Sequence, residues 1–299
     1  MNNNATLVLK ILDLNRSTYY YNLSHRNIEK KKPVGKPASG YSLDTTGKKV
    51  CDEEIKELII KGIEEDAFAY GYRKIKHFLY RDYGLILNHK KVYRLCKELE
   101  VLKPQRKIKS KGNKHIAINR IVKKSNSVWE MDIKYGYIQG EDKFFFVLAM
   151  IDVFDRCIVD YYIGLRCEGS NAASLIKRGL MKRGLFETVD KPVIRTDNGP
   201  QFISNIFEHT CLEITIHHER IPCRTPNKNA HIESFNKILQ EECIGINEFD
   251  DYMEAYKSVS DFMRRYNKRR IHSSIKYKTP EEFYNLFKDT EVEEMIIKL

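Results

Sequence analysis

Two acidic side chains, one at the end of a strand-like segment and one near the start of a helix-like segment, constrain this chain most. The strand-like residues 193–196 lead directly into Asp197 and a run of turn-forming residues, as expected for a strand that ends in a tight turn. After 35 further residues, Glu233 lies in a segment for which Asn229 is a suitable helix N-cap. This pattern predicts an α/β fold in which a strand and a helix each contribute one carboxylate.

A third acid, Asp132, lies upstream in the strand-like residues 128–137. Carboxylates are protein ligands that Mg²⁺ and Mn²⁺ prefer, and a pair of such ions can activate water or a 3′-hydroxyl for attack on a phosphate. Taken singly, each acid has an ordinary explanation. Asp132 shares a strand face with Glu130 and could face solvent, while Asp197 could be a turn acid and Glu233 an exposed helix acid. Their order and setting together favour a metal site.

The positive charge of the chain is concentrated in its front part. The net charge is +11 over 299 residues, but residues 1–125 carry +15 and residues 126–299 carry −4. A basic region of this kind suggests a polyanionic partner, commonly nucleic acid, although a basic surface that serves only solubility would give the same count. The acidic balance of the back part suits a site that gathers divalent cations.

The cysteines and the apolar runs indicate the compartment. The seven cysteines are odd in number and include no C-x-x-C pair, which favours free thiols in a reducing cytosol over a disulfide framework. The longest fully apolar run, residues 144–151, is too short to span a bilayer, and the N-terminus lacks a secretory signal pattern. We therefore expect a cytoplasmic, nucleoid-associated protein without a membrane partner.

Shifts in composition and in hydrophobic period divide the chain into six expected segments. They are a short helical segment like half of a helix-turn-helix (1–23), a linker (24–49), a helix-turn-helix-like DNA-binding domain (50–102), a basic linker (103–126), an α/β core with a C-terminal helix (127–287) and a tail (288–299). In the first segment, Ser17 is the expected cap of a second short helix. An amphipathic hairpin that packs on a neighbour is the alternative for this segment.

Residues 50–102 predict three helices, of which the third is basic. Its expected N-cap is Asn88, and the faces away from its apolar side carry Lys90, Lys91, Arg94 and Lys97. A third helix of this kind suggests a helix-turn-helix unit that places these cations on DNA phosphates. A charged helix face that is merely solvated is the alternative.

Residues 127–287 predict a mixed sheet with flanking helices. The expected strands are 128–137, 143–151, 157–165, 193–196 and 214–217, and the expected helices are 170–183, 203–210, the segment after Asn229 and 248–270. The helix that carries Glu233 should bury one apolar face, formed by Ile232, Phe235, Ile238 and Leu239. Lys237 lies one turn beyond the acid, and the last helix ends in basic residues that include Arg269 and Arg270.

Asp132, Asp197 and Glu233, with their neighbours and the 35-residue gap, resemble the DDE triad of the retroviral-integrase-like transposases. Three further motifs extend the likeness over almost the whole chain: Ala-Tyr-Gly-Tyr-Arg-Lys-Ile at 69–75, Tyr-Asn-Lys-Arg-Arg-Ile-His at 266–272 and Tyr-Lys-Thr-Pro-Glu-Glu-Phe at 277–283. The set is most similar to bacterial insertion-sequence transposases of the IS three group, and specifically to their second-reading-frame product.

This resemblance implies a core like that of ribonuclease H and retroviral integrase, with a mixed five-stranded sheet and flanking helices, preceded by an all-α helix-turn-helix region. It implies a transposase in which Asp132, Asp197 and Glu233 hold two Mg²⁺ or Mn²⁺ ions. Such an enzyme cleaves insertion-sequence ends and transfers their 3′-hydroxyl strands, with no covalent protein–DNA intermediate. The implied partners are double-stranded DNA of the terminal inverted repeats and of the target, further copies of the chain on that DNA, and an upstream-frame protein.

The resemblance also assigns expectations to residues near the acids. Asn198, Gly199 and Gln201 match the family's loop after the second acid and should shape the floor of the site, and Trp129 is expected in the core. The further DNA-contact candidates are Lys237, Arg269 and Arg270. Gln240 stands where family members often carry Lys or Arg, which weakens one expected DNA contact.

Two other functions compete with the transposase. One is a non-catalytic or partial DNA-binding regulator of transposition that lacks the upstream-frame domain. The other is a nuclease of the same fold that acts on RNA–DNA hybrids, which the long basic front part of the chain disfavours.

Overall fold

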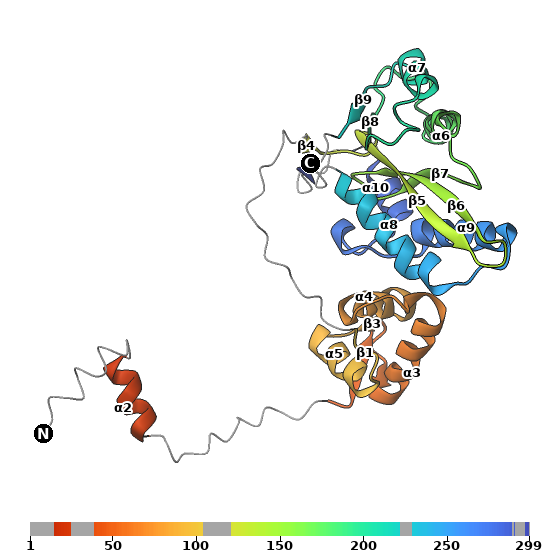
Figure 1. Cartoon of the computed structure of the whole chain (residues 1–299). Coiled ribbons are helices and arrows are strands. Elements are labelled where there is room, and N and C mark those ends of the chain that lie inside the picture. Colours follow the sequence, from red (N-terminus) through yellow and green to blue (C-terminus); the bar gives the residue numbers. More distant parts are fainter. Residues whose placement is uncertain are drawn as a thin grey trace, which may run out of the picture.

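The computed structural model describes residues 15–24, 39–103, 121–221, 229–288, 290 and 297–298. Within these ranges, a small helical unit lies beside a larger unit built on a five-stranded sheet (Figure 1). Expectations for residues 1–14, for most of both linkers and for most of the C-terminal tail fall outside the described residues. None of the described helices is long and apolar enough to cross a membrane.

The described N-terminal helix, α2 (Arg16–Ser24), begins one residue before Ser17, which was the expected cap. Asn15 has the capping role instead, because its side-chain oxygen accepts hydrogen bonds from the Ser17 backbone N–H at 3.2 Å and from the Ser17 hydroxyl at 2.9 Å. Asn and Ser are comparably good caps, so sequence alone does not decide between two candidates this close together.

The helical unit contains the three helices predicted for it. They are α3 (Asp52–Gly62), which continues into the π-helical turn η1 (Ile63–Ala67), α4 (Tyr72–Tyr83) and α5 (His89–Glu98). Ile55, Leu79 and Leu95, one from each helix, are fully buried in a common core. α4 ends at Gly84, which adopts the left-handed conformation with φ 66°. Asn88 caps α5 by accepting a hydrogen bond from the Lys90 N–H at 2.9 Å.

A β-hairpin occupies part of the segment expected to be a linker. Its strands are β1 (Tyr41–Asp44) and β2 (Lys49–Cys51), and β1 also pairs with β3 (Leu85–Ile86). The Asp44 carboxylate accepts hydrogen bonds from the backbone N–H groups of Thr46 and Lys48, and Gly47 supplies the positive φ of the turn. These strands are too short to show a hydrophobic period, and β1 reaches its second partner only after two helices have folded back.

The larger unit contains the predicted mixed five-stranded sheet. Its strands lie in the order β7-β6-β5-β8-β9, where β5 is Val128–Ile138, β6 is Lys143–Asp152, β7 is Ile158–Gly164, β8 is Val193–Thr196 and β9 is His218–Arg220. β5 pairs with β6 and β6 with β7 in antiparallel fashion, whereas β5, β8 and β9 are parallel. The last strand lies slightly later than the expected residues 214–217.

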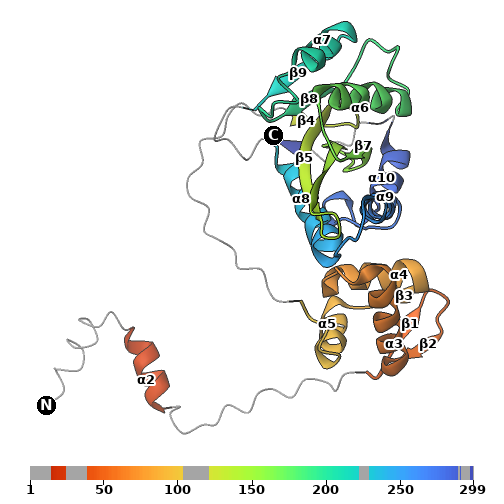
Figure 2. The same cartoon turned by 45° about the vertical axis from the view of Figure 1, so that its right-hand side comes forward.

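The sheet separates two apolar cores (Figures 1 and 2). On one face, α6 (Gly169–Lys182) and α7 (Asn205–Glu213) pack on a core that includes Trp129 and Met131 of β5. On the other face, α8 (Ala230–Glu242) and α9 (Tyr252–Lys268) pack on a core that includes Ile138 of β5. Side chains alternate along a strand, so Glu130 and Asp132 point toward the α8 side.

Short elements complete the larger unit. They are the 3₁₀ turns η3 (Ile244–Ile246) and η4 (Ser273–Ile275), helix α10 (Pro280–Phe287), and the strands β4 (Ile121–Val122) and β10 (Ile297–Lys298), which pair with each other. A capping box between Thr279 and Glu282 begins α10. Phe283 of α10 and Val128 of β5 belong to a third buried cluster near one end of the sheet.

The segment that follows α9 ties the two units together. Ile271 is buried within the apolar core of the helical unit, and its backbone N–H donates a hydrogen bond to the Tyr70 hydroxyl at 3.1 Å. At the edge of this contact, Arg81 forms a bidentate ion pair with Glu282. The motifs at 69–75 and 266–272, which are far apart in the sequence, therefore meet in one interface.

Candidate active site

Asp132 and Asp197 lie on neighbouring parallel strands. The β5–β8 register pairs Glu130 with Arg195, so the same register, continued by two residues, places Asp132 beside Asp197 immediately after β8 ends. Neighbouring strands are about 4.8 Å apart, and equivalent positions on parallel strands point to the same face. The two carboxylates thus lie at one level of the sheet.

The loop after β8 fixes the backbone around Asp197. The Asp197 Oδ1 atom accepts a hydrogen bond from the Gly199 N–H at 2.8 Å. Asn198 donates from its side-chain amide to the Ile221 carbonyl at 2.7 Å, and Gln201 donates to the Cys167 carbonyl at 3.1 Å. These hydrogen bonds fix the conformation of the loop whose residues are expected to shape the floor of the site.

Glu233 lies exposed in the first turns of α8, and a hydrogen bond joins that helix to Asp132. Asn236, one turn beyond Glu233, donates from its side-chain amide to the Asp132 Oδ2 atom at 2.8 Å. The predicted buried face is present, because Ile232, Phe235 and Leu239 are fully or almost fully buried. α8 therefore packs its apolar face on the sheet and presents Glu233 near the two strand acids.

The three acids interact electrostatically. Burial, helped by the charges of Asp197 and Glu233, raises the pKa of Asp132 to about 6, against the hydrogen bonds from the Ile133 N–H and Asn236, which lower it. Burial and the charge of Glu130 raise the pKa of Glu233. In the described ranges, however, no three or more His, Cys, Asp or Glu side chains are grouped closely enough to hold a metal ion. The charges of Asp197 and Glu233 thus act on Asp132, but the three carboxylates would have to move closer together to bind one cation jointly.

Two side chains of this region were not identified from the sequence as part of the site. One is Asn236, which holds Asp132. The other is Glu130, which is fully buried and whose pKa burial raises to about 7, although it shares a strand face with Asp132 that could have faced solvent. The signal available for Glu130 was its spacing of two residues from Asp132, which puts both acids under the same helix.

In α5, the structure pairs two of the four expected DNA contacts with acids of the chain. Lys91 contacts Asp52 at 2.6 Å, and its side chain is only 14% exposed. Arg94 contacts Asp52 at 2.6 Å and Glu98 at 2.8 Å. Lys90 and Lys97 are exposed and have no ion pair within the described ranges. The Lys91 ammonium group is thus engaged within the helical unit, and its contact with DNA stays a prediction.

The remaining DNA-contact candidates lie on α8 and after α9. Lys237 is exposed one turn after Glu233 and pairs with Glu241 at 3.5 Å. Arg269 pairs with Asp66 of the helical unit at 3.0 Å but stays half exposed. Arg270 is buried, and its guanidinium bonds to Glu242, so its contact with DNA stays a prediction that would require the side chain to leave this position.

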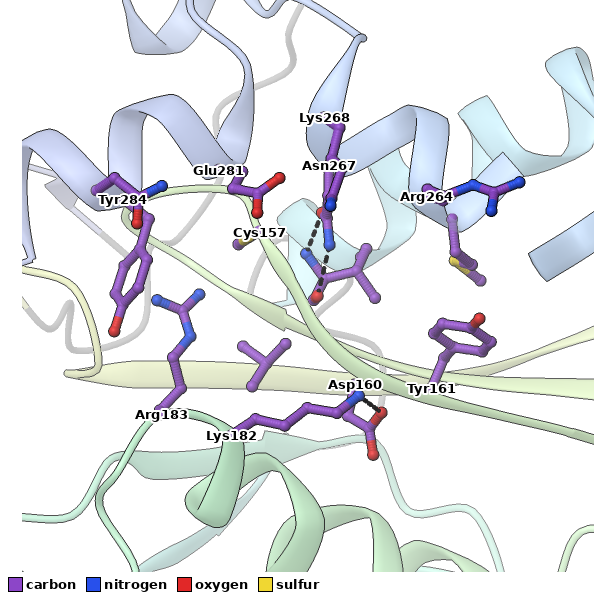
Figure 3. Close-up of a pocket in the computed structure, with 14 residues that line it drawn as sticks. Cys157, Asp160, Tyr161, Lys182, Arg183, Arg264, Asn267, Lys268, Glu281 and Tyr284 are labelled. Carbon is purple, nitrogen blue, oxygen red and sulfur yellow. Dashed lines mark hydrogen bonds and ion pairs between the residues drawn. The ribbon is translucent and has the colours of Figure 1, made fainter. Parts of the chain in front are cut away.

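A surface pocket lies away from the acids, between β7, α6, α9 and α10 (Figure 3). Its polar groups are largely satisfied within the chain, because Lys182 pairs with Asp160 at 2.5 Å and Asn267 bonds to both backbone groups of Ile158 at 2.9 Å. Asp132, Asp197 and Glu233 are not among its lining residues. This pocket is therefore separate from the candidate site.

Three family models match this chain. An HTH-like domain matches residues 51–109, and two integrase core domain models match residues 122–226 and 214–280. Together they span the helical unit and most of the sheet-based unit.

Curated proteins from mobile elements are similar to this chain. An uncharacterized 39.2 kDa protein of insertion element IS476 from Xanthomonas euvesicatoria is 32% identical over 72% of this chain, which spans 60% of that protein's length. The transposase for insertion sequence element IS904 from Lactococcus lactis is 26% identical over 79% of this chain and 96% of its own length. Transposase InsD of insertion element IS2 from Escherichia coli is 24% identical over 72% of this chain and 73% of its own length.

Solved structures of retroviral proteins are similar at lower identity. A chain from a simian T-cell lymphotropic virus intasome in complex with a PP2A regulatory subunit matches 81% of this chain and 78% of its own length, with 17% identity and a TM-score of 0.49. The HTLV-2 integrase catalytic core domain in complex with magnesium matches 53% of this chain and 95% of its own length, with 19% identity and a TM-score of 0.36.

Proposed function

We propose that this chain cleaves the ends of an insertion sequence and transfers the resulting 3′-hydroxyl strands into target DNA. The proposal starts from its family: the chain belongs to the insertion-sequence transposases of the IS three group and has an HTH-like domain and an integrase core. Asp132, Asp197 and Glu233 are the proposed catalytic acids. The observation that supports the proposal is the β5–β8 register, which pairs Glu130 with Arg195 and which, if continued by two residues, brings Asp132 and Asp197 together, while Asn236 bonds α8 to Asp132.

The side-chain chemistry of the proposed acids suits a pair of Mg²⁺ or Mn²⁺ ions. Their donors are all carboxylates, the ligand type that hard divalent cations favour, and the mutual repulsion of the acids at Asp132 is of the kind that a cation relieves. Such ions, when bound, would polarise the phosphate and stabilise the attacking and leaving oxygens. The chain itself would hold Asp132 through Asn236 and Asp197 through the turn at Gly199.

Two successive displacements at phosphorus account for the proposed reaction. In the first, water attacks a phosphate at the element end, the bond from phosphorus to the 3′-oxygen breaks, and a 3′-hydroxyl is released. In the second, this hydroxyl loses its proton and attacks a target phosphodiester, which forms one new phosphorus–oxygen bond and releases a target 3′-hydroxyl. Neither displacement uses a protein nucleophile, so no covalent protein–DNA intermediate is expected.

The helical unit is the proposed DNA-binding module. Lys90, Tyr93 and Lys97 are exposed and recur at intervals of three and four residues, which places them on one side of α5. Lysines in such a row can neutralise phosphates, and an exposed tyrosine can contact the sugar-phosphate backbone. Lys237 and Arg269 stay in the proposal as contacts from the sheet-based unit, since both side chains are more than half exposed.

Replacing Lys90 and Lys97 together with Ala should weaken DNA binding and flatten its salt dependence. Each lost phosphate contact lowers the slope of log K against log salt by about 0.9, so the double variant should lose about two units of slope. The measurement is a salt titration of the full chain on element-end duplex and on an unrelated duplex. Lys91→Ala is the contrasting variant: it should lower thermal stability, because it leaves the buried Asp52 with Arg94 as its one remaining ion-pair partner among the described residues. An unchanged slope in the double variant would mean that this face is only solvated.

A cleavage assay tests the function and separates it from the regulator alternative. The purified chain is mixed with labelled element-end duplex, target DNA and Mg²⁺ or Mn²⁺, and 3′-end nicks and joined strands are scored. Strand transfer by the chain alone supports the proposal, and transfer only after the upstream-frame protein is added makes that protein an obligatory partner. Specific binding with no cleavage in either case would favour the regulator. Sizing the protein on DNA shows whether further copies assemble there.

A further inference from the structure

The carboxylate of Glu130 bonds directly to the start of α8. Its Oε2 atom accepts hydrogen bonds from the backbone N–H groups of His231 at 3.1 Å and of Ile232 at 3.0 Å. The His231 ring lies 3.3 Å from its Oε1 atom. Glu130 is fully buried, so these contacts are made away from solvent, between residues about a hundred positions apart in the sequence.

α8 has no side-chain cap of its own. Asn229 occupies the N-cap position, but its side chain makes no capping hydrogen bond. The first N–H groups of a helix need an acceptor, and a carboxylate at this end also interacts favourably with the helix dipole. Glu130, on β5, therefore does for α8 what a local Ser, Asp or Asn does for most helices, and it links the helix to the strand of Asp132.

Two arginines lie near the Glu130 carboxylate. Arg195 lies opposite Glu130 in the β5–β8 register and is itself buried and bonded to Glu219 of β9. Burial raises the pKa of Glu130 to about 7, whereas its hydrogen bond from the Ile232 N–H and the charges of Arg195 and Arg156 lower it. The hydrogen bonds to the start of α8 are therefore the contacts that fix the position of this carboxylate.

Given the proposed function, we propose that Glu130 is a positioning residue that sets where Glu233 lies relative to Asp132. The Ile232 N–H that it binds belongs to the residue immediately before Glu233. A second tie between β5 and α8, the hydrogen bond from Asn236 to Asp132, lies one turn after Glu233. The two ties bracket the helical acid, and both begin on the same face of β5, two residues apart. Loss of the Glu130 tie frees the end of α8 that carries Glu233.

Four variants of the full chain test this role. Glu130→Met keeps the length of the side chain but removes both acceptors, whereas Glu130→Gln keeps one oxygen that can accept from the helix. Glu130→Asp keeps the acid but shortens its reach, and it replaces the Met variant in the comparison if that variant does not fold. Asp155→Asn is the matched control, because Asp155 is also fully buried with a pKa raised to about 7, yet it binds the Cys157 N–H and Arg183 instead of α8.

Two measurements are made on each variant: amide hydrogen exchange in a peptide that covers 229–239, without metal, and Mn²⁺ affinity by titration. Glu130→Met should lose protection in this peptide and bind Mn²⁺ about 10–100-fold more weakly, the range seen when the partner of a metal ligand is removed. Glu130→Gln should restore most of both properties. Asp155→Asn should lower the melting temperature and leave both unchanged.

Equal protection and equal Mn²⁺ affinity in Glu130→Met and Asp155→Asn would overturn the positioning role. So would a Gln variant as impaired as the Met variant, because the retained acceptor would then have no effect. The exchange measurement reports on the tie whether or not a cation binds. Failure of the wild-type chain to bind Mn²⁺ would therefore count against the proposed function, while loss of protection in Glu130→Met would still support the tie.

Discussion

Replacing Asp197 with Asn is expected to abolish strand transfer, with a loss of about 10³-fold or more. The change removes one negative ligand from the proposed cation pair, which is worth several kcal/mol of transition-state stabilisation at about 1.4 kcal/mol per factor of ten. The fold should be unaffected, since Asn has nearly the same volume and its side-chain oxygen can still accept the Gly199 N–H. The measurement is strand transfer of the full chain in Mg²⁺ and in Mn²⁺.

Asp190→Asn is a suitable control, because Asp190 is also an exposed loop acid but lies before β8 instead of after it. This variant should transfer strands like the wild type. Both variants should keep the wild-type melting temperature and DNA affinity, so that lost activity reports on the chemistry alone. Activity that persists in Asp197→Asn would mean that the reaction takes place at another site.

The parts of the fold that local patterns determine were predictable from the sequence. β6 reads as a continuous apolar run because both of its faces are buried, and the strand-turn pattern at Asp197 is local as well. The buried face of α8 follows from its helical period, with Ile232, Phe235 and Leu239 in the core. The strand-turn segment and α8 carry Asp197 and Glu233, so the elements that hold two of the three proposed acids could be predicted from the sequence.

The ion pairs could not be predicted, because the partner of a charged side chain depends on tertiary packing. A lysine on a basic helix looks the same whether it faces solvent or an acid, and only the approach of α3 shows that Lys91 pairs with Asp52. Glu130 gave no sign of being buried, since the helix that covers it starts about a hundred residues later. The hairpin at 41–51 is similar, because β1 needs β3 as its second partner.

Breaking the buried pair of Glu242 and Arg270 should lower stability strongly. Arg270 bonds to Glu242 at 2.7 and 3.1 Å, and the two side chains are 10% and 8% exposed. Glu242→Ala should lower the free energy of unfolding by about 3–5 kcal/mol, because it leaves the Arg270 charge buried without its partner. Urea denaturation of wild type and variant, followed by circular dichroism, measures this loss.

A double variant separates two contributions to the free energy of unfolding: the loss caused by an unpaired buried charge and the stabilisation by the ion pair itself. Glu242→Met with Arg270→Met removes both charges and keeps most of the volume, so it should recover much of the stability that either single change loses. Arg270→Ala also tests the original expectation of a DNA contact here. It should lower stability, and its salt slope on DNA should match that of the wild type, because a guanidinium bonded to Glu242 releases no counterions from phosphates. A reduced slope with unchanged stability would instead place Arg270 on the DNA.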